Sequence, residues 1–339
     1  MIVDEDIMQS KLDNICYKPN EIKIAIQNNK PIEDKLHVIL VVSNPCLYAR
    51  RYLLMKEFLL RFEKEEPDAI VYLVEMAYGQ QKYYMTKSDN PRHLQLRTET
   101  PLWHKENMIN LGVKYLLPET WKAFAWIDAD VEFLNANWAM DTLRVLNGSR
   151  DIVQIFSQII NMDVNKDSIA INHSAGFKYC EGNNYREEGV DYWHPGYAWA
   201  MTRKAYEKIG GLYELGILGS GDYIMLMCLL GKDVSYFNKM NHLHDYKNSV
   251  NEHFKLKIKD LKFGYVPGTL KHYFHGTKEN RKYNDRRNIL IKYGYSPYQY
   301  LVKDSVGILI PSSTFPEEMK ADILKYFQER KEDENESLF

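Results

Sequence analysis

The sequence predicts an α/β fold in which a mostly parallel central sheet is covered by helices on both faces. Three apolar runs, at residues 37–43, 69–77 and 123–128, have the length and composition of buried strands. Segments with apolar residues at helical spacing lie between them. Strands that alternate with helices form parallel sheets, because each helix carries the chain back across one face of the sheet.

The first half of the chain shows this alternation most clearly. The strand at 37–43 stops at an Asn-Pro pair, and residues 48–64 follow with apolar side chains at helical spacing. A Pro-Asp break precedes the second strand, and a helix at about 103–116 leads into the third. The second half is less regular, and we expect its glycine- and asparagine-rich loops to build a site.

We expect three parts along the chain: an N-terminal extension at 1–35, one large domain at 36–295 and a C-terminal helical tail at 296–339. The large domain has a first half at 36–135 and a second half at 150–290. The tail contains a charged helix that ends in the acidic run EDENES. We expect this run to fray, because it has little apolar surface to bury.

Composition excludes several classes of protein. The chain has 339 residues with 45% hydrophobic content, which is ample for a large core. Its 44 Lys and Arg against 46 Asp and Glu give a net charge of −2, so no overall field attracts nucleic acid or anionic membranes. The four cysteines form no CxxC pair, and no apolar run approaches the roughly 20 residues of a membrane span. We therefore expect a cytoplasmic protein without a membrane partner.

The strongest chemical signal is the segment FAWIDADV at 124–131, in which an apolar strand ends in Asp128 and Asp130. Ligands of open α/β sheets gather at the carboxyl ends of the strands. Hard divalent cations prefer carboxylate oxygens and are often held together with substrate phosphates. The pair therefore predicts Mn²⁺ or Mg²⁺ with a diphosphate. The alternative is a turn whose aspartates only bond the backbone.

A second group of motifs follows, with WHPGYAWAMTR at 193–203, a Gly-Gly pair at 210–211 and GSGD at 219–222. The last of these places Asp222 at the glycine-flanked start of an apolar helix. A carboxylate in that position can face a cleft and accept a proton. Asp222 is also a candidate helix N-cap, and the two roles are compatible.

Together with the DAD segment, these motifs resemble the GT-A class of glycosyltransferases, family-2-like, over roughly residues 36–290. The resemblance implies a metal-dependent glycosyltransferase with a DxD motif, a donor half at 36–135 and an acceptor half at 150–290. It implies a nucleoside diphosphate sugar as donor and Asp222 as the general base of an inverting transfer. Members of the class often carry a second acid before this one. Here the position is Gly221, which leaves inversion or retention open.

The segment GTLKHYFHGTK supplies two histidines. If residues 270–274 form a strand, His272 and His275 point to opposite faces, so at most one of them reaches the metal. The class often adds a late histidine beside a glycine as third metal ligand, sometimes followed by a lysine for the diphosphate. The resemblance thus favours His275 as ligand with Lys278 nearby. His272 remains the alternative ligand, and a hydrogen-bonding role remains open for both.

The resemblance also places the nucleotide near the end of the first strand and near the helix before the metal motif. The donor-binding candidates in these segments are Ser43, Asn44, Arg97, Lys105 and Asn107. Farther along, Arg281 is a candidate for the phosphates, with Arg286 and Arg287 close by, because a guanidinium matches phosphate geometry. Turn formation and a solvated helix face are the alternatives for these residues.

Some segments, among them LQLRTETPLWHKENMINLG and WIDADVEF, also resemble viral glycosyltransferases that decorate hydroxymethylated DNA bases. This resemblance implies a DNA-modification enzyme whose acceptor is a hydroxymethylpyrimidine. The phosphates and the extruded base of the DNA would contact two groups of side chains. These are the basic residues Lys278, Arg281, Lys282, Arg286 and Arg287 and the aromatic residues Tyr192, Trp193, Tyr197 and Trp199.

Other functions stay open at this point. The net charge of −2 argues against a dedicated DNA binder, so a glycan or protein-linked sugar is an alternative acceptor. A nucleotidyltransferase uses a similar sheet, although VVSNPCLYARR after the first strand lacks a glycine-rich phosphate loop. A sugar- or nucleic-acid-binding module without catalysis is the remaining alternative.

Overall fold

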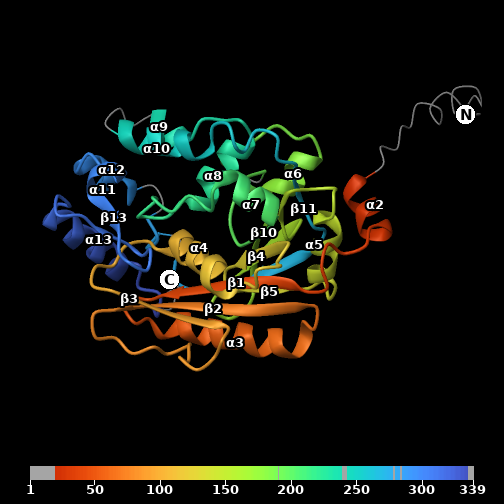
Figure 1. The fold of residues 1–339 in the computed structure, drawn as a ribbon, viewed down its shortest axis with the longest axis horizontal. Coiled ribbons are helices and arrows are strands. Elements are labelled where there is room, and N and C mark those ends of the chain that lie inside the picture. Colours follow the sequence, from red (N-terminus) through yellow and green to blue (C-terminus); the bar gives the residue numbers. More distant parts are fainter. Residues whose placement is uncertain (1–19, 190, 239–242, 278, 283–284, 335–339) are drawn as a thin grey trace, which may run out of the picture.

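The structure is a computed structural model that describes residues 20–189, 191–238, 243–277, 279–282 and 285–334 (Figure 1). Its centre is a seven-stranded sheet with the strand order β11-β6-β10-β4-β1-β2-β3. The strands are β1 (Leu36–Ser43), β2 (Ala69–Tyr78), β3 (His93–Thr98), β4 (Ala123–Ile127), β6 (Ile152–Gln154), β10 (Ala198–Thr202) and β11 (Phe263–Tyr265).

The central sheet is mostly parallel. Strand β1 pairs in parallel with β2 and β4, and β2 pairs in parallel with β3. Strand β10 runs antiparallel to both of its neighbours, β4 and β6, while β11 is parallel to β6. The mixed α/β architecture with a mostly parallel sheet between helices confirms the predicted fold class.

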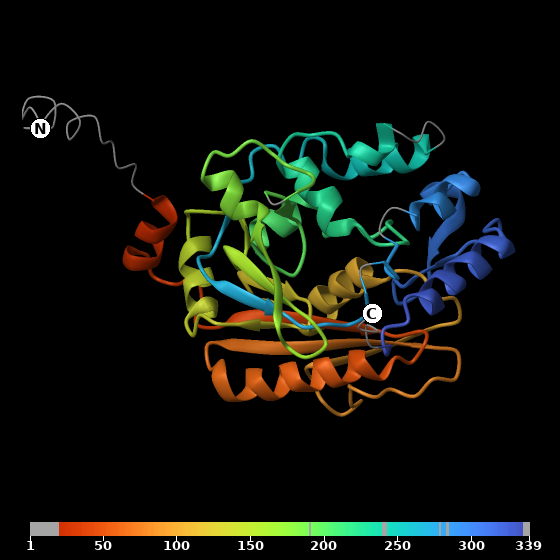
Figure 2. The ribbon, with the colours of Figure 1, turned by 180° about the vertical axis from the view of Figure 1, so that it is seen from behind.

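Helices cover both faces of this sheet (Figures 1 and 2). Alternate residues of β1 enter two separate cores, because successive side chains of a strand point to opposite faces. Val38 and Leu40 share one core with Phe58 of α3, whereas Ile39 shares the other with Ile109 of α4. The helices beside these cores are α2 (Glu21–Asn28), α3 (Ala49–Glu65) and α5 (Trp138–Leu146) for the first, and α4 (Lys105–Leu116), α7 (Arg203–Ile209) and α8 (Gly221–Leu229) for the second.

A second sheet begins where β4 ends. Its order is β5-β12-β7-β8-β9, with β5 (Val131–Phe133), β7 (Gln158–Met162), β8 (Ser168–Ser174), β9 (Trp193–His194) and β12 (Thr269–His272). Since β4 ends at Ile127 and β5 starts at Val131, the DAD turn is the direct link between the two sheets. Any group held on this turn is therefore fixed from two sides.

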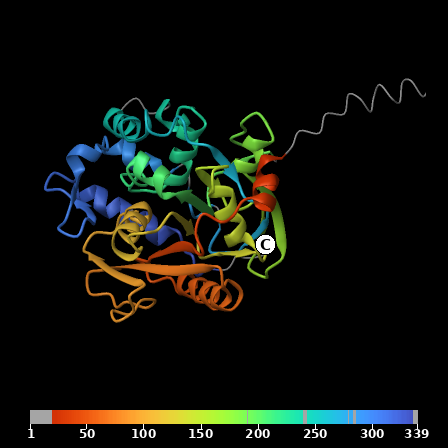
Figure 3. The ribbon, with the colours of Figure 1, turned by 45° about the vertical axis from the view of Figure 1, so that its right-hand side comes forward.

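The rest of the second half is largely helical, as Figure 3 shows from the side. It comprises α6 (Ala175–Cys180), α9 (Ser235–Asn238), α10 (His244–Phe254), α11 (Arg287–Lys292), α12 (Pro297–Tyr300), the hairpin β13 (Leu301–Lys303) and β14 (Leu309–Pro311), and α13 (Glu317–Glu329). Among the described helices, none is long and apolar enough to cross a membrane.

The C-terminal segment differs from the expected frayed tail. Leu309 of β14 and Ile323 of α13 belong to the same core as α4. After α13 the chain turns back toward β1, and the side chain of Glu332 is fully buried. The sequence-based expectation of a frayed acidic run was therefore wrong for residues 332–334, and the rest of the run lies outside the described residues. A carboxylate from this run binds two arginines inside the protein and so needs no apolar surface.

Helix α4 approaches the central sheet most closely at Gly112. A Cβ atom at this position would lie 3.0 Å from methyl carbons of Ile39 and Val74. We expect Gly112→Val to lower the free energy of unfolding by about 1–3 kcal/mol, because the extra methyl groups overpack this contact. Urea denaturation followed by circular dichroism measures the change. Lys114→Val puts the same side chain on the exposed face of α4, and an equal loss there would contradict the packing argument.

Candidate active site

The DAD turn carries its two aspartates out of the end of β4, as the sequence predicted. The backbone N–H of Asp128 donates to the carbonyl of Tyr197 at 2.8 Å, and the N–H of Tyr273 donates to the carbonyl of Asp130 at 2.8 Å. These bonds tie the turn to the chain on both sides. The two carboxylates are therefore held at the carboxyl end of a parallel strand, where α/β sheets bind their ligands.

One aspartate and two histidines form a candidate metal group. Nε2 of His275 lies 2.7 Å from Oδ2 of Asp130, and Nε2 of His272 lies 3.9 Å from the same oxygen. The two Nε2 atoms are 3.3 Å apart. All three ligand atoms fall within 4.8 Å of one another, which is close enough for one cation to touch them all.

The structure corrects the expectation that only one histidine can reach the metal. Strand β12 ends at His272, so strand alternation does not apply to His275. His272 is paired with Val131 of β5, next to Asp130. The chain after β12 bends back, and His275 reaches the same carboxylate from the other side. Both histidines therefore belong to the group.

Neighbouring residues prepare His272 for ligation. The amide nitrogen of Asn161 donates to Asn172 Oδ1 at 2.8 Å, which leaves Asn161 Oδ1 as an acceptor. Nδ1 of His272 lies 3.0 Å from that oxygen and so carries the proton that it donates. The lone pair of its Nε2 consequently faces Asp130 and His275. Such an outer hydrogen bond is typical of metal-ligating histidines.

The charges of this group suit a divalent cation. Burial lowers the pKa of both imidazoles, so they are neutral at pH 7 and can ligate. Burial works against ionisation of Asp130, but His275, His272 and Arg281 outweigh it and hold the pKa of this carboxyl below its usual range. Among the described residues, the buried Oδ1 of Asp130 has no hydrogen-bond partner. An ionised oxygen without a donor, beside two neutral imidazoles, fits a bound metal.

Asp128 lies outside this group. Its Oδ1 is 2.7 Å from Nζ of Lys105, the first residue of α4. The same ammonium lies 3.2 Å from Oδ2 of Asp222. Partial burial, opposed by Lys105, raises the pKa of the Asp128 carboxyl to about 6. Lys105 thus bridges the metal-bearing turn and the predicted catalytic acid.

Asp222 is the second residue of α8, and its side chain is free to face the site. The N-cap of α8 is Ser220, with a left-handed backbone at φ 74° and no side-chain capping bond, so the N-cap role expected for Asp222 is wrong. Backbone conformations of this kind cost of order 1 kcal/mol and gather at functional sites. Oδ2 of Asp222 lies 3.9 Å from where a Cβ would stand at Gly196, and the ring of His194 lies 3.4 Å from the same point.

A buried acid that sequence reasoning missed lies behind Asp222. A Cβ at Gly221 would fall 2.1 Å from Oε1 of Glu106, so the glycine makes room for this carboxyl. Burial and the nearby Asp222 raise the pKa of Glu106 to about 8. The carboxyl of Glu106 thus occupies the space that a side chain at position 221 would fill. In the sequence Glu106 directly follows Lys105 at a helix start, and no pattern of its own marks it.

An aromatic cluster surrounds His194, whose ring lies near Gly196 and Asp222. The ring of His194 stacks on Tyr197 with centroids 4.1 Å apart, and Tyr192 meets His194 edge-on at 5.6 Å. Tyr197 also has a left-handed backbone, with φ 83°. Trp193 and Trp199, which the sequence suggested as stacking residues, are only 2% and 0% exposed and belong to the core. The accessible rings here come from a histidine and two tyrosines.

A cavity of ≈ 190 Å³ opens next to the metal group. One side is apolar and the other carries the predicted polar residues together with two arginines that the sequence did not indicate. Its lining includes Val41, Val42, Ser43, Arg51, Leu54, Met55, Leu102, Trp103, His104, Lys105, Asp128, Ala129, Asp130, His275, Phe327 and Arg330. The combination of an apolar wall and converging charged groups is typical of ligand pockets.

Three of the predicted donor-binding residues lie elsewhere. Asn44 is buried and bonds the backbone N–H and carbonyl of Tyr48, so it shapes the loop after β1. Asn107 donates to Glu214 and to the carbonyl of Gly307, which ties α4 to the hairpin β13–β14. Arg97 donates to the carbonyls of Gly79 and Gln81 and lines a separate surface hollow.

The basic cluster is buried more than the sequence suggested. Arg281 and Arg286 are 8% and 6% exposed, and Lys278 lies outside the described residues. The guanidinium of Arg286 packs on the ring of Trp103 and donates to Tyr326 and to Ser220. Arg281 is close enough to the metal group to influence the charge of Asp130. Neither Arg281 nor Arg286 therefore forms part of a basic outer surface.

Comparison with known proteins gives distant likenesses. No protein family model and no curated protein sequence matches the chain. A β-1,4-galactosyltransferase 7 from Drosophila, in complex with manganese, UDP-Gal and xylobiose, is 11% identical with a TM-score of 0.39 over 82% of this chain and 93% of that chain. The mannosyltransferase PcManGT from Pyrobaculum calidifontis, in complex with GDP-Man and Mn²⁺, is 12% identical with a TM-score of 0.36 over 80% and 66%.

A third likeness is to a protein named as a glucose-1-phosphate thymidylyltransferase from Bacillus anthracis, in complex with a sucrose. It is 9% identical with a TM-score of 0.34 over 70% of this chain and 89% of that chain. At these identities the likeness concerns the general fold alone.

We expect Asp130→Asn, His272→Ala and His275→Ala each to lower the affinity for Mn²⁺ about tenfold or more, because each removes one of the grouped ligand atoms. Isothermal titration calorimetry with Mn²⁺ measures this. Asp128→Asn should have a smaller effect, since its carboxylate is paired with Lys105.

The matched control for these variants is His244→Ala, which removes an exposed imidazole from α10. It should leave the affinity unchanged. Wild-type affinity in all three ligand variants would exclude this group as a metal site.

Proposed function

We propose that the protein is a metal-dependent glycosyltransferase that moves a sugar from a nucleoside diphosphate sugar to an acceptor hydroxyl. The observation that carries the proposal is the ammonium of Lys105. It holds Asp128 of the metal-bearing turn at 2.7 Å and Asp222 at 3.2 Å. One ammonium thus holds the metal-bearing turn and a candidate base close together, as a transfer from a diphosphate to a hydroxyl requires.

The donor set favours Mn²⁺ over Mg²⁺. Magnesium is bound almost entirely through oxygen, whereas this group offers one carboxylate and two imidazoles. Asp130, His272 and His275 would hold the ion. When bound, it would offset the negative charge that develops on the departing diphosphate.

The remaining residues would orient the reactants. Lys105 is buried between two carboxylates, and although burial lowers the pKa of its ammonium, Asp128 and Asp222 outweigh this and raise it, so the charge persists at neutral pH. It would keep Asp222 in place while that carboxylate accepts the proton of the acceptor hydroxyl. Glu106 with its pKa of about 8 is mostly protonated at pH 7, and adds no further negative charge behind Asp222.

The surroundings of Asp222 favour a saccharide as acceptor over a DNA base. The ring of His194 lies near it beside Gly196, and the rings of Tyr192 and Tyr197 contact His194; such rings suit the apolar face of a sugar. Gripping the backbone of DNA requires an accessible basic surface. Arg281 and Arg286, which were the candidates for that contact, are buried.

The acceptor class is tested by offering both acceptors under identical conditions. The enzyme is incubated with Mn²⁺, a panel of nucleotide sugars, and either short oligosaccharides or DNA that contains 5-hydroxymethylpyrimidines. We expect a hexose or pentose mass increment on a saccharide and none on the digested nucleosides. An increment on the nucleosides alone would replace the saccharide by DNA as acceptor.

We expect Asp222→Asn to lower turnover about 100-fold or more, because a positioned base typically contributes 10²–10⁴ to the rate. Donor affinity should stay close to wild type, since Asp222 is not among the residues that line the cavity. The measurements are release of nucleoside diphosphate and calorimetry with the donor. The product should have inverted configuration by NMR.

The control is Asp233→Asn, which removes an exposed carboxylate outside the site. A retained anomeric configuration would remove the base role from Asp222. Absence of any metal-dependent release of nucleoside diphosphate, with every donor tried, would contradict the proposed function as a whole.

A further inference from the structure

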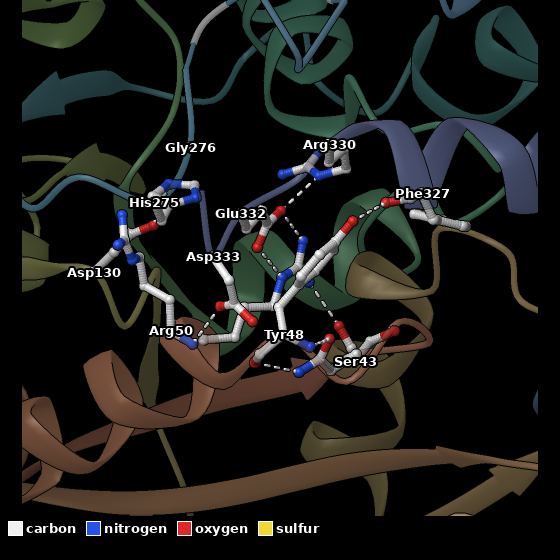
Figure 4. A network of polar contacts seen from close by, with 12 residues as sticks. Ser43, Tyr48, Arg50, Asp130, His275, Gly276, Phe327, Arg330, Glu332 and Asp333 are labelled. Atoms are coloured by element: carbon white, nitrogen blue, oxygen red, sulfur yellow. Dashed lines mark hydrogen bonds and ion pairs between the residues drawn. The ribbon is translucent and has the colours of Figure 1, made fainter. Parts of the chain in front are cut away.

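The segment that follows α13 lies beside the cavity, and its first carboxylate, Glu332, contacts two arginines of the cavity lining (Figure 4). Lys331 turns the chain with a left-handed backbone at φ 45°. The hydroxyl of Tyr48 donates to the carbonyls of Phe327 and Gln328 and accepts from the N–H of Lys331, which anchors this turn to the loop after β1. Of the next two residues, Glu332 points into the protein, whereas Asp333 stays exposed and contacts the start of α3.

Glu332 is enclosed by two arginines. Arg51 donates from Nε and Nη2 to its two carboxylate oxygens at 2.5 and 2.6 Å, and Arg330 donates from Nε at 2.6 Å. The side chain of Glu332 has no solvent exposure. Both arginines line the cavity next to Asp130 and His275. A two-pronged guanidinium contact of this kind also suits phosphate oxygens.

Asp333 covers the start of α3. Its carboxylate accepts from the backbone N–H groups of Ala49 at 2.9 Å and Arg50 at 2.8 Å. The N-cap residue of this helix, Tyr48, makes no side-chain capping bond. Free N–H groups at a helix start attract anions. Glu332 thus pairs with two guanidinium groups, and Asp333 accepts hydrogen bonds from the N–H groups at the start of α3.

The segment also touches the chain that carries the metal group. Gly276 follows His275 directly, and a Cβ atom there would lie 3.2 Å from the carbonyl oxygen of Arg330 and 3.2 Å from Cα of Glu332. The carboxylate of Glu332 therefore lies on the side of the cavity where a diphosphate would reach from the metal group. Figure 4 shows His275 and Glu332 on neighbouring segments of the backbone.

The free space is too small for the donor that the proposed function requires. The cavity holds ≈ 190 Å³, whereas pockets for ligands of this size usually measure about 300–1,000 Å³. Much of its lining comes from β1, α3 and α4, which belong to the packed layers of the fold. The segment after α13 is the part that can leave without breaking a sheet or a helix.

We infer that Arg51 and Arg330 form the binding place for the diphosphate of the donor, and that residues 331–334 occupy it as an internal competitor. Glu332 stands where one phosphate binds, so the segment must withdraw before the donor can enter. This inference rests on the proposed function for the identity of the ligand. It adds the residues that bind the diphosphate and a means of controlling access to them.

The charges of the two anions favour replacement of Glu332 by a diphosphate. A diphosphate presents several anionic oxygens to Arg51 and Arg330, whereas Glu332 presents two. The left-handed backbone of Lys331 is unfavourable for a residue other than glycine. Withdrawal releases this strain, and the incoming phosphates replace the lost ion pairs. An anionic ligand can therefore displace a segment that is otherwise well bonded.

The test measures binding of inorganic pyrophosphate and of UDP by isothermal titration calorimetry, on the full chain and with EDTA present. We expect Glu332→Gln to bind both ligands about tenfold or more tightly than the wild type, because the competing charge is gone while the shape is kept. Glu334→Gln changes the same segment at an exposed ion pair with Lys331 and should bind like the wild type. The double variant Arg51→Gln with Glu332→Gln should not show this increase in affinity.

A second measurement keeps the inference testable if the Glu332 variant folds poorly. Hydrogen exchange on the wild type should show faster exchange of the amide of Lys331 when pyrophosphate is added, and no change with an equal ionic strength of chloride. Wild-type or weaker affinity in Glu332→Gln, or slower exchange of Lys331 on binding, would overturn the competition. Tighter pyrophosphate binding without sugar transfer from any donor would leave this site standing and reject the glycosyltransferase proposal.

Discussion

The ammonium of Lys105 is the interaction on which the arrangement of the site depends. Asp128 and Asp222 come from two different segments, and two carboxylates this close together would repel one another without the cation between them. Lys105 is placed there by the start of α4, and α4 is held against β1 and β2 by the close contact at Gly112. Packing far from the chemistry therefore decides where the metal-bearing turn and the candidate base stand relative to each other.

Much of the first half could be predicted from the sequence, because strands buried on both faces leave uninterrupted apolar runs such as β1 and β4. The positions of Ser43, Lys105, Asp128 and Asp130 at one cavity followed from the rule that ligands bind at the carboxyl ends of parallel strands. The role of His272 did not follow, because the end of β12 is set by its pairing with β5 and β7 and not by its own residues.

Contacts between distant segments explain the rest of what sequence reasoning missed. Arg51 and Glu332 are 281 positions apart, and neither has a local pattern that points to the other. Glu106 escaped notice for a similar reason, because its meaning appears only when Gly221 of α8 is brought against it. The acidic run near the C-terminus has the composition of a solvated tail. Charged groups can nevertheless be buried when a fold supplies partners of opposite sign, and composition alone does not reveal those partners.

The ring of Trp103 lies close to two guanidinium groups. The guanidinium of Arg286 lies 5.6 Å from its ring and that of Arg330 lies 5.5 Å away. The chain has six tryptophans, and the other five are at most 7% exposed in the cores, so Trp103 is the one that borders the cavity. Its fluorescence depends on the distance and orientation of these charges. The protein thus carries a built-in optical reporter of the chain that follows α13, which makes its movements observable without any label.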